Sequence, residues 1–340
     1  MKSGQVTIKD LAKELGISPS TVSRALSGHP DISEKTIKRV TELAAKYKYQ
    51  PNSIALSLRS SKTRTIGVVI PEIAHFFFAT VICGIEDLAA ERGYNVILCH
   101  SNEQYEKEVK DARALFSHRV DGLLVSISKS TTDFEHFKPF LEQQRPVIFF
   151  DRVPKDFEAT TVTVKDKQGA YLATEHLIQQ GCKRIVHLAG PEKLSISMER
   201  LNGYQQALQE HGLPLDPKLV IDCNHGAHLD ESDQIVTGLL EQGLEFDGVF
   251  ANNDLTAVGA IKAIKRKGIK IPHEVAVIGY SDWPLAALVE PALSSIHQPG
   301  YEMGTLAAEL FFELLNDPEG PIQHKVLDTH LVARESSIRR

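Results

Sequence analysis

The sequence predicts a small N-terminal all-α helix-turn-helix head and a larger α/β body of two doubly wound parallel-sheet subdomains. Three helical patterns occupy the first 50 residues, and from Thr65 onward short apolar runs alternate with amphipathic stretches. The length of 340 residues allows two or three domains, and the apolar share of 42% is typical of a globular chain. We expect the head at 1–50, a hinge helix and linker at 51–64, and the body at 65–340.

The head contains three candidate helices. Thr7, Ser18 and Ser33 are N-cap candidates, because each precedes apolar residues that recur at helical spacing. Gly16 and Gly28 end the first and second helices. Two short helices joined by a tight glycine-containing turn, with a third helix as a buttress, form a helix-turn-helix unit.

Charge is distributed unevenly along the chain. Residues 1–64 contain 12 Lys and Arg but 5 Asp and Glu, whereas the rest contains 26 Lys and Arg and 39 Asp and Glu, so a head and linker of net charge +7 precede a body of −13. This is the charge pattern of a nucleic-acid-binding module joined to a second domain. A solvated basic helix surface would give the same balance. Charge alone does not separate the two interpretations, but the three-helix pattern favours DNA.

The second helix is the candidate recognition helix. Its polar residues Ser20, Thr21, Ser23 and Arg24 lie outside its apolar stripe. Short hydroxyls and one long donor can reach phosphates and base edges. The same residues could instead serve as helix caps and a surface ion pair.

The segment after the head predicts a helix of about two turns, which is marginal alone in water. It places the apolar Leu58 beside Arg59. Minor-groove-binding proteins insert an apolar wedge of this kind between base steps and so kink the duplex. In an ordinary linker, Leu58 would instead contact the next domain.

The head and hinge contain the stretches VTIKDLAKELGISPSTVSRALSGHPDISEKT and PNSIALSLRS. Together they resemble the LacI (lac repressor) family of bacterial transcription regulators. The resemblance implies a homodimer on pseudo-palindromic double-stranded operator DNA, with hinge helices that order only on the operator and Leu58 as the wedge. It also implies major-groove contacts from Ser20, Thr21 and Arg24. The candidate DNA-binding residues are Thr7, Ser18, Ser20, Thr21, Ser23, Arg24, Asn52, Leu58 and Arg59.

The body contains seven apolar runs of strand length. They are TIGVVI, YNVILCHS, GLLVSI, PVIFFD, RIVHLAG, GVFAN and VAVIGY. Amphipathic stretches such as 103–117 and 166–180 separate most of them. Continuous apolar strands between helices indicate parallel sheets covered on both faces.

Seven strands exceed one compact sheet, so we expect two similar subdomains with a break at about 152–163. Two later runs, 293–299 and 326–333, are expected to be strands at crossovers that return to the first subdomain. The expected boundaries are about 65–160 with 294–325 for the first subdomain, and about 161–293 with 326–340 for the second.

Polar and aromatic clusters follow several of the predicted strands. Open parallel sheets bind ligands at the carboxyl ends of their strands, and two lobes place that crevice between them. Each cluster could instead supply helix caps, core packing or surface charge, but their shared position favours a cleft for a small molecule. The candidate ligand-binding residues are Phe77, Phe78, Asp151, Arg200, Asn253, Asp254, Ser281, Asp282 and Trp283.

The resemblance to the LacI family extends through AGPEKLSISMERLNGYQQAL, FANNDLTAVGAIKAI, AVIGYSDWPLAALVEPALSSIHQP and LVARES. It implies the fold of periplasmic sugar-binding proteins, with an effector in the cleft and Arg200 and Asn253 at effector-contacting positions. The chain departs from the pattern at Ser281, where many members have Asp, and at His75 and Phe76, where Asn-Pro is commoner. An arginine fork binds a hydroxyl pair, a carboxylate or a phosphate, so a sugar, a sugar acid and a sugar phosphate all stay open.

No enzyme motif is present: the sequence has no G-x-x-x-x-G-K-[ST], strand-following G-x-G-x-x-G, G-x-S-x-G or H-E-x-x-H pattern. We therefore expect no enzyme activity, cofactor or metal. A transport-type binding protein would need an export signal, and the N-terminus shows none, so we expect a cytoplasmic protein without a membrane span. The end LVARESSIRR adds no heptad helix, which favours a dimer over a tetramer.

These expectations combine into a linkage hypothesis. Effector binding would favour one angle between the lobes, which would change the spacing of the paired heads and therefore operator affinity. The sequence does not decide whether the effector acts as inducer or corepressor. Repression is the commoner outcome for this architecture.

Overall fold

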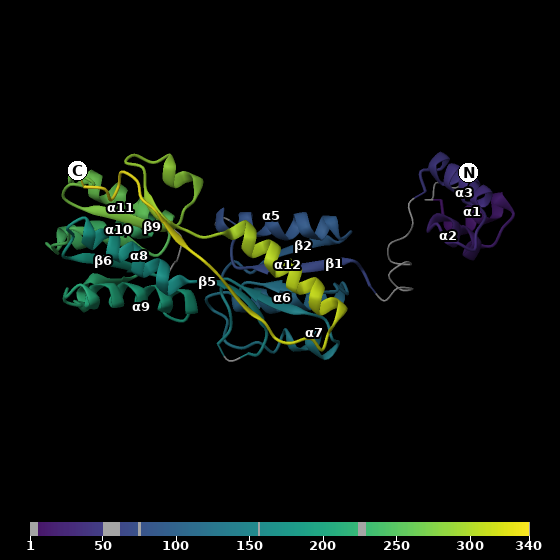
Figure 1. Ribbon diagram of the computed structural model, residues 1–340, viewed down its shortest axis with the longest axis horizontal. Helices are drawn as coiled ribbons and strands as arrows, with labels where there is room; N and C mark the ends of the chain where they lie inside the picture. Colours follow the sequence, from purple (N-terminus) through teal and green to yellow (C-terminus); the bar gives the residue numbers. More distant parts are fainter. Residues whose placement is uncertain (1–5, 50–61, 74–75, 156, 224–228, 340) are drawn as a thin grey trace. The chain divides into compact units, whose positions relative to one another are not determined.

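The computed structural model describes residues 6–49, 62–73, 76–155, 157–223 and 229–339 (Figure 1). The chain divides into two compact units, Met1–Thr63 and Arg64–Arg340. Asn52, Leu58 and Arg59, predicted for the hinge helix, lie outside the described residues. Within the described ranges, no helix is long and apolar enough to cross a membrane.

The head forms the three predicted helices, and local capping bonds define their starts. The Thr7 N–H donates to Asp10 Oδ2 at 2.9 Å, so this backbone donor at the start of the first helix has a hydrogen-bond partner. Gly16, with a φ of 66°, ends that helix. Ser18 Oγ accepts from the Thr21 N–H at 3.1 Å and caps the second. The helices are α1 (Ile8–Leu15), α2 (Pro19–Leu26) and α3 (Glu34–Lys46).

One residue from each helix anchors the core of the head. Leu11, Val22 and Val40 are completely buried and belong to one apolar cluster. This packing fixes α2 against α1 and α3, and it leaves the polar face of α2 outside the cluster.

The first lobe of the body is a six-stranded parallel sheet in the order β11-β5-β4-β3-β1-β2. One apolar cluster joins α5 and α12 to one face, and another joins α6 and α7 to the opposite face. The strands are β1 (Thr65–Ile70), β2 (Asn95–His100), β3 (Gly122–Val125), β4 (Val147–Phe150), β5 (Thr160–Val164) and β11 (His324–Leu327). The helices are α5 (Phe76–Glu91), α6 (Tyr105–Ser117), α7 (Lys138–Glu142) and α12 (Gly300–Asn316).

The second lobe repeats this architecture in the order β12-β10-β9-β8-β6-β7, with only the β10–β12 pair antiparallel. α10 and α11 cover one face, and α8 and α9 cover the other. The strands are β6 (Ile185–Ala189), β7 (Val220–Asp222), β8 (Gly248–Ala251), β9 (Ala276–Ser281), β10 (Ser294–His297) and β12 (His330–Val332). The helices are α8 (Asp166–Gln179), α9 (Ser195–Glu210), α10 (Leu229–Glu241) and α11 (Asp254–Arg266), with short 3₁₀ turns at Pro217–Leu219 and Pro284–Ala287.

The predicted fold class is confirmed, but the strand partners near the crossovers differ from the expected boundaries. β5, expected at the start of the second lobe, is a strand of the first sheet, and β11 pairs with it. β10, expected in the first lobe, pairs with β9 in the second. The chain therefore crosses between lobes after β5, after β10 and after β11. The apolar pattern shows that a segment is a strand but does not show which sheet it joins.

Candidate functional site

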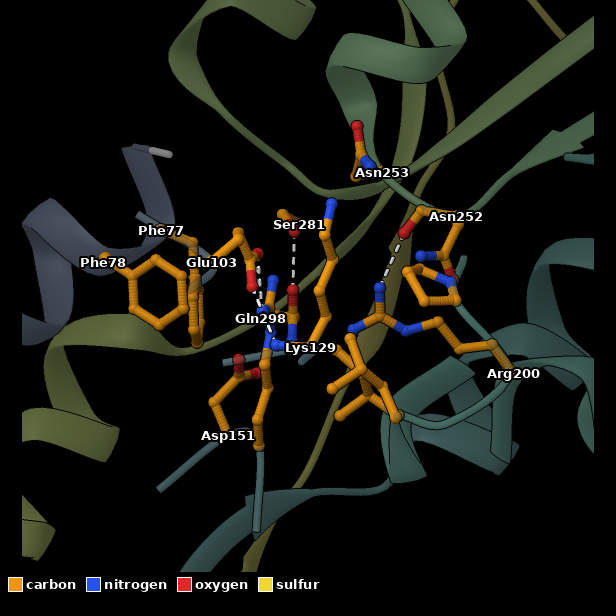
Figure 2. Close-up of a pocket in the computed structure, with 14 residues that line it drawn as sticks. Phe77, Phe78, Glu103, Lys129, Asp151, Arg200, Asn252, Asn253, Ser281 and Gln298 are labelled. Atoms are coloured by element: carbon orange, nitrogen blue, oxygen red, sulfur yellow. Dashed lines mark hydrogen bonds and ion pairs between the residues drawn. The ribbon is translucent and has the colours of Figure 1, made fainter. Parts of the chain in front are cut away.

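A cleft lies where the strand ends of the two lobes meet (Figure 2). The first lobe contributes residues after β2, β3 and β4 and the start of α5, and the second contributes residues after β6, β8 and β10, the end of β9 and the start of α9. The cavity, which is partly open to solvent, measures about 40 Å³, which is room for only a few water molecules. Its lining consists of Phe77, Phe78, Glu103, Lys129, Asp151, Arg152, Pro191, Leu194, Ile196, Arg200, Asn252, Asn253, Ser281 and Gln298.

Arg200 is the best-anchored cation in this lining. Its side chain extends from α9, and the residue is only 3% exposed. Its Nε donates to Asp166 Oδ1 at 2.8 Å, and its Nη1 donates to the Asn252 carbonyl at 2.6 Å. The guanidinium carbon lies 3.8 Å from the centre of the Tyr280 ring. Burial opposes the charged form, but Asp166, Tyr280 and Asp151 outweigh it and hold the pKa of Arg200 above its ordinary value.

The facing wall of the first lobe is also charged. Glu103 accepts from the Lys129 backbone N–H at 2.8 Å and from Arg152 Nη1 at 2.7 Å. Burial alone would raise the pKa of Glu103, but Arg152 and the Lys129 N–H together lower it. The Arg152 guanidinium also lies 5.9 Å from the Phe78 ring centre. This network orders the loop after β3 and places Lys129 at the cleft.

Asp151 directly follows β4 and lines the cleft (Figure 2). Its φ of 58° lies in the left-handed region, which is uncommon for a residue other than glycine and is often found at ligand sites. Burial raises its pKa to about 6, despite the opposing effect of Arg152. Its carboxyl group can therefore change protonation state near neutral pH.

The second lobe adds amide and hydroxyl groups. Asn253 caps α11 by accepting from the Thr256 N–H at 2.9 Å, and Ser281 Oγ donates to Gln298 Oε1 at 2.6 Å. The buried Asn252 Oδ1 accepts no hydrogen bond within the described part of the chain. Such an orphaned acceptor is suited to a ligand hydroxyl.

Three predicted residues do not line this cleft. Asp254 is completely buried and accepts from Ser295 Oγ at 2.5 Å and from the Trp283 N–H at 2.7 Å. Asp282 forms an ion pair with Arg334 at 2.7 Å. These contacts join the end of β9 to β10 and the segment after β12, so Asp254, Asp282 and Trp283 support the cleft from behind.

Sequence reasoning missed several groups that the structure brings to the site. Glu103 and Lys129 follow β2 and β3, so the strand-end rule was the signal that could have found them. Asn252 precedes the predicted Asn253 directly. Gln298 directly follows β10 and Asp166 lies two residues after β5, so the same rule applies to both, but it does not reveal their partners, which are distant in the sequence.

The head presents the predicted recognition residues on one helix. Ser20 and Arg24 on α2 are exposed, and Thr21 and Ser23 are half-buried. Ser18 Oγ lies 2.7 Å from Ser20 Oγ, so these hydroxyls gather at the start of α2. Thr7 and Ser18 act as helix caps within the head.

A helix-turn-helix head joined to a two-lobed α/β body with a polar cleft defines the class of ligand-responsive DNA-binding regulators. Residues 7–52 match the family model described as bacterial regulatory proteins, lacI family, and residues 174–337 match the periplasmic binding protein-like domain. The chain belongs to the lacI family. The similar proteins of this family are transcription regulators rather than enzymes.

Similar proteins match over nearly the whole chain. The ribose operon repressor of Halalkalibacterium halodurans is 32% identical over 97% of this chain and 97% of its own. The transcriptional regulator CelR–cellobiose complex has 28% identity and a TM-score of 0.73, covering 97% of this chain and 99% of that one. The lac repressor dimer bound to operator and the anti-inducer ONPF has 23% identity and a TM-score of 0.88, covering 99% and 100%, and supports the fold.

Proposed function

We propose that this regulator is a repressor whose affinity for a specific operator is controlled by a small carbohydrate-like effector in the cleft. The observation that carries the proposal is the arrangement of charged groups on both walls. Arg200 is anchored in the second lobe, while Glu103, Lys129 and Arg152 form a connected network in the first. A ligand that contacts both walls would favour one interlobe arrangement over others, which is the requirement for allosteric control.

The lining suits a molecule with several hydroxyl groups. Carboxylate, amide and guanidinium groups supply both donors and acceptors, and the edge-to-face Phe77 and Phe78 rings supply an apolar surface for C–H groups. Ribose and cellobiose in the names of the similar proteins agree with this chemistry. A sugar, a sugar acid and a sugar phosphate all fit the arginine fork. Because the cavity is small, we propose that the lobes separate to admit any of them.

On DNA, we propose a cytoplasmic homodimer that binds a pseudo-palindromic operator. Each α2 would enter the major groove, with Ser20, Thr21 and Arg24 at base edges and phosphates. The hinge would add Leu58 as a minor-groove wedge. Asn253 and Asp151 would contact the effector directly, whereas Asp254, Asp282 and Trp283 would hold their surroundings in place.

The test is selection of bound sequences from random duplex DNA by the purified full chain, followed by operator titrations with D-ribose, cellobiose, D-gluconate and glucose 6-phosphate. We expect an enriched near-palindrome whose affinity shifts with one compound. Lack of enrichment at moderate salt would overturn the operator role. Enrichment without any shift, and without a change in melting temperature, would overturn the carbohydrate effector.

A further inference from the structure

We propose that Asp166 is a positioning residue that orients Arg200 and couples the cleft to the strands that cross between the lobes. This inference rests on the proposed function and adds to it the residue that carries the effector signal. Asp166 is the first residue of α8 and directly follows the crossover after β5. It does not line the cleft itself.

The first step is the contact between Asp166 and Arg200. Asp166 is 5% exposed, and its Oδ1 accepts from Arg200 Nε at 2.8 Å. With Nη1 on the Asn252 carbonyl and the ring of Tyr280 beneath it, the guanidinium is held on three sides. Charge-assisted bonds of this kind define geometry as well as energy. The direction of the Arg200 fork therefore depends on the Asp166 carboxylate.

The second step is the contact between the start of α8 and the crossover after β11. The Lys165 N–H donates to the Leu327 carbonyl at 3.0 Å, and Lys165 Nζ lies 2.6 Å from Asp328 Oδ1. Thr329 Oγ1 donates to the Lys165 carbonyl at 3.5 Å. Two of the three interlobe crossovers are therefore bonded to each other immediately beside Asp166.

The third step is the close packing of α8 against these strands. The Tyr280 hydroxyl donates to the Asp166 carbonyl at 3.4 Å. A Cβ on Gly169 would lie 2.4 Å from the same hydroxyl and 2.9 Å from Thr329 Oγ1, so only glycine fits there. With so little free space around the start of α8, we expect a shift of the Arg200–Asp166 pair toward a ligand to be transmitted to α8 and the crossovers.

The test compares Asp166→Asn with the full-length wild type. In the wild type, the Arg200 Nε–H should exchange slowly with solvent, measured by NMR with ¹⁵N-labelled arginine and assigned through Arg200→Lys. Exchange in Asp166→Asn should be at least about tenfold faster, because the charge-assisted bond is lost. Unchanged protection of the Arg200 Nε–H would overturn the proposal, whether or not an effector has been found.

The coupling measurement uses whichever of D-ribose, cellobiose, D-gluconate and glucose 6-phosphate raises the wild-type melting temperature most. At saturation, the compound should change wild-type operator affinity by about 5- to 150-fold, but that of Asp166→Asn by less than about twofold. A merely structural role would lower stability or effector affinity and leave the change at saturation intact. Equal coupling in both proteins would overturn the proposal while leaving the proposed function standing.

Two further variants keep the result interpretable. Asp233→Asn is the matched control, because Asp233 is also buried and pairs with Arg266 at 2.6 Å in the same lobe but outside the cleft lining. It should leave coupling unchanged. Asp166→Glu keeps the carboxylate and should retain part of the coupling. It therefore tests the proposal even if Asp166→Asn folds poorly. If no compound binds, the carbohydrate effector fails, and the exchange measurement still decides the role of Asp166.

Discussion

Neutralising one partner of the buried Arg200–Asp166 pair should destabilise the body more than neutralising both. Arg200→Met removes the guanidinium while keeping much of its apolar volume, and it leaves the Asp166 carboxylate buried without its counter-ion. Breaking a buried pair in this way costs about 3–5 kcal/mol. Asp166→Asn leaves the Arg200 charge in the same position and should cost a similar amount. Either loss is large against a total stability of about 5–15 kcal/mol.

The double variant, Arg200→Met with Asp166→Asn, leaves no buried charge at this position. Its cost should fall below that of either single variant, so it should fall short of the sum of the two single costs by at least about 3 kcal/mol. Trp283 is the sole tryptophan of the chain and is 7% exposed in the second lobe, so its fluorescence reports unfolding of the body in urea. Costs that add within about 0.5 kcal/mol would refute the reasoning, because independent sites behave that way.

Three further predictions concern other parts of the chain. Burial raises the pKa of Asp254 from 3.8 to about 7, so between these pH values the folded chain holds a proton that the unfolded chain releases. The contribution of this carboxyl group to stability should be fully present below pH 4 and be lost as pH rises toward 7, and urea titrations of Asp254→Asn should lack this component of the wild-type pH dependence. Gly169→Ala would force a Cβ against Tyr280 and Thr329, and thermal unfolding should show a loss of about 1–3 kcal/mol. Leu58→Ala should weaken operator binding in a gel-shift titration while leaving effector affinity unchanged, and equal operator affinity would remove the wedge assignment.

The head was predictable because its signals are local. A capping side chain and the backbone donor that it satisfies are three residues apart, as with Ser18 and Thr21. The left-handed φ of Gly16 likewise depends only on its neighbours in the turn. Such short-range chemistry can be recognised in the sequence without any knowledge of the tertiary structure.

The cleft was only partly predictable, because the strand-end rule identifies loops and does not give the direction of each side chain. Asn253 and Asp254 are adjacent, yet Asn253 lines the cleft and Asp254 faces Ser295 behind it. At the end of β9, positive φ values of 106° at Ser281 and 55° at Asp282 turn the chain, so Ser281 lines the cleft while Asp282 pairs with Arg334. These directions follow from backbone geometry that the apolar pattern does not encode.

The partner of Arg200 shows most clearly what could not be predicted from the sequence. Asp166 lies 34 residues earlier and starts a different helix, so no periodicity links the two. Their contact exists because α8 and α9 cover the same face of the second sheet, and because β5, which leads into α8, belongs to the first sheet. The exchange of strands between lobes was the part of the fold that the sequence assigned incorrectly, and it also places the cleft-lining Arg200 one hydrogen bond away from a residue beside an interlobe crossover. Prediction of the contact between Asp166 and Arg200 therefore required the strand order of both sheets.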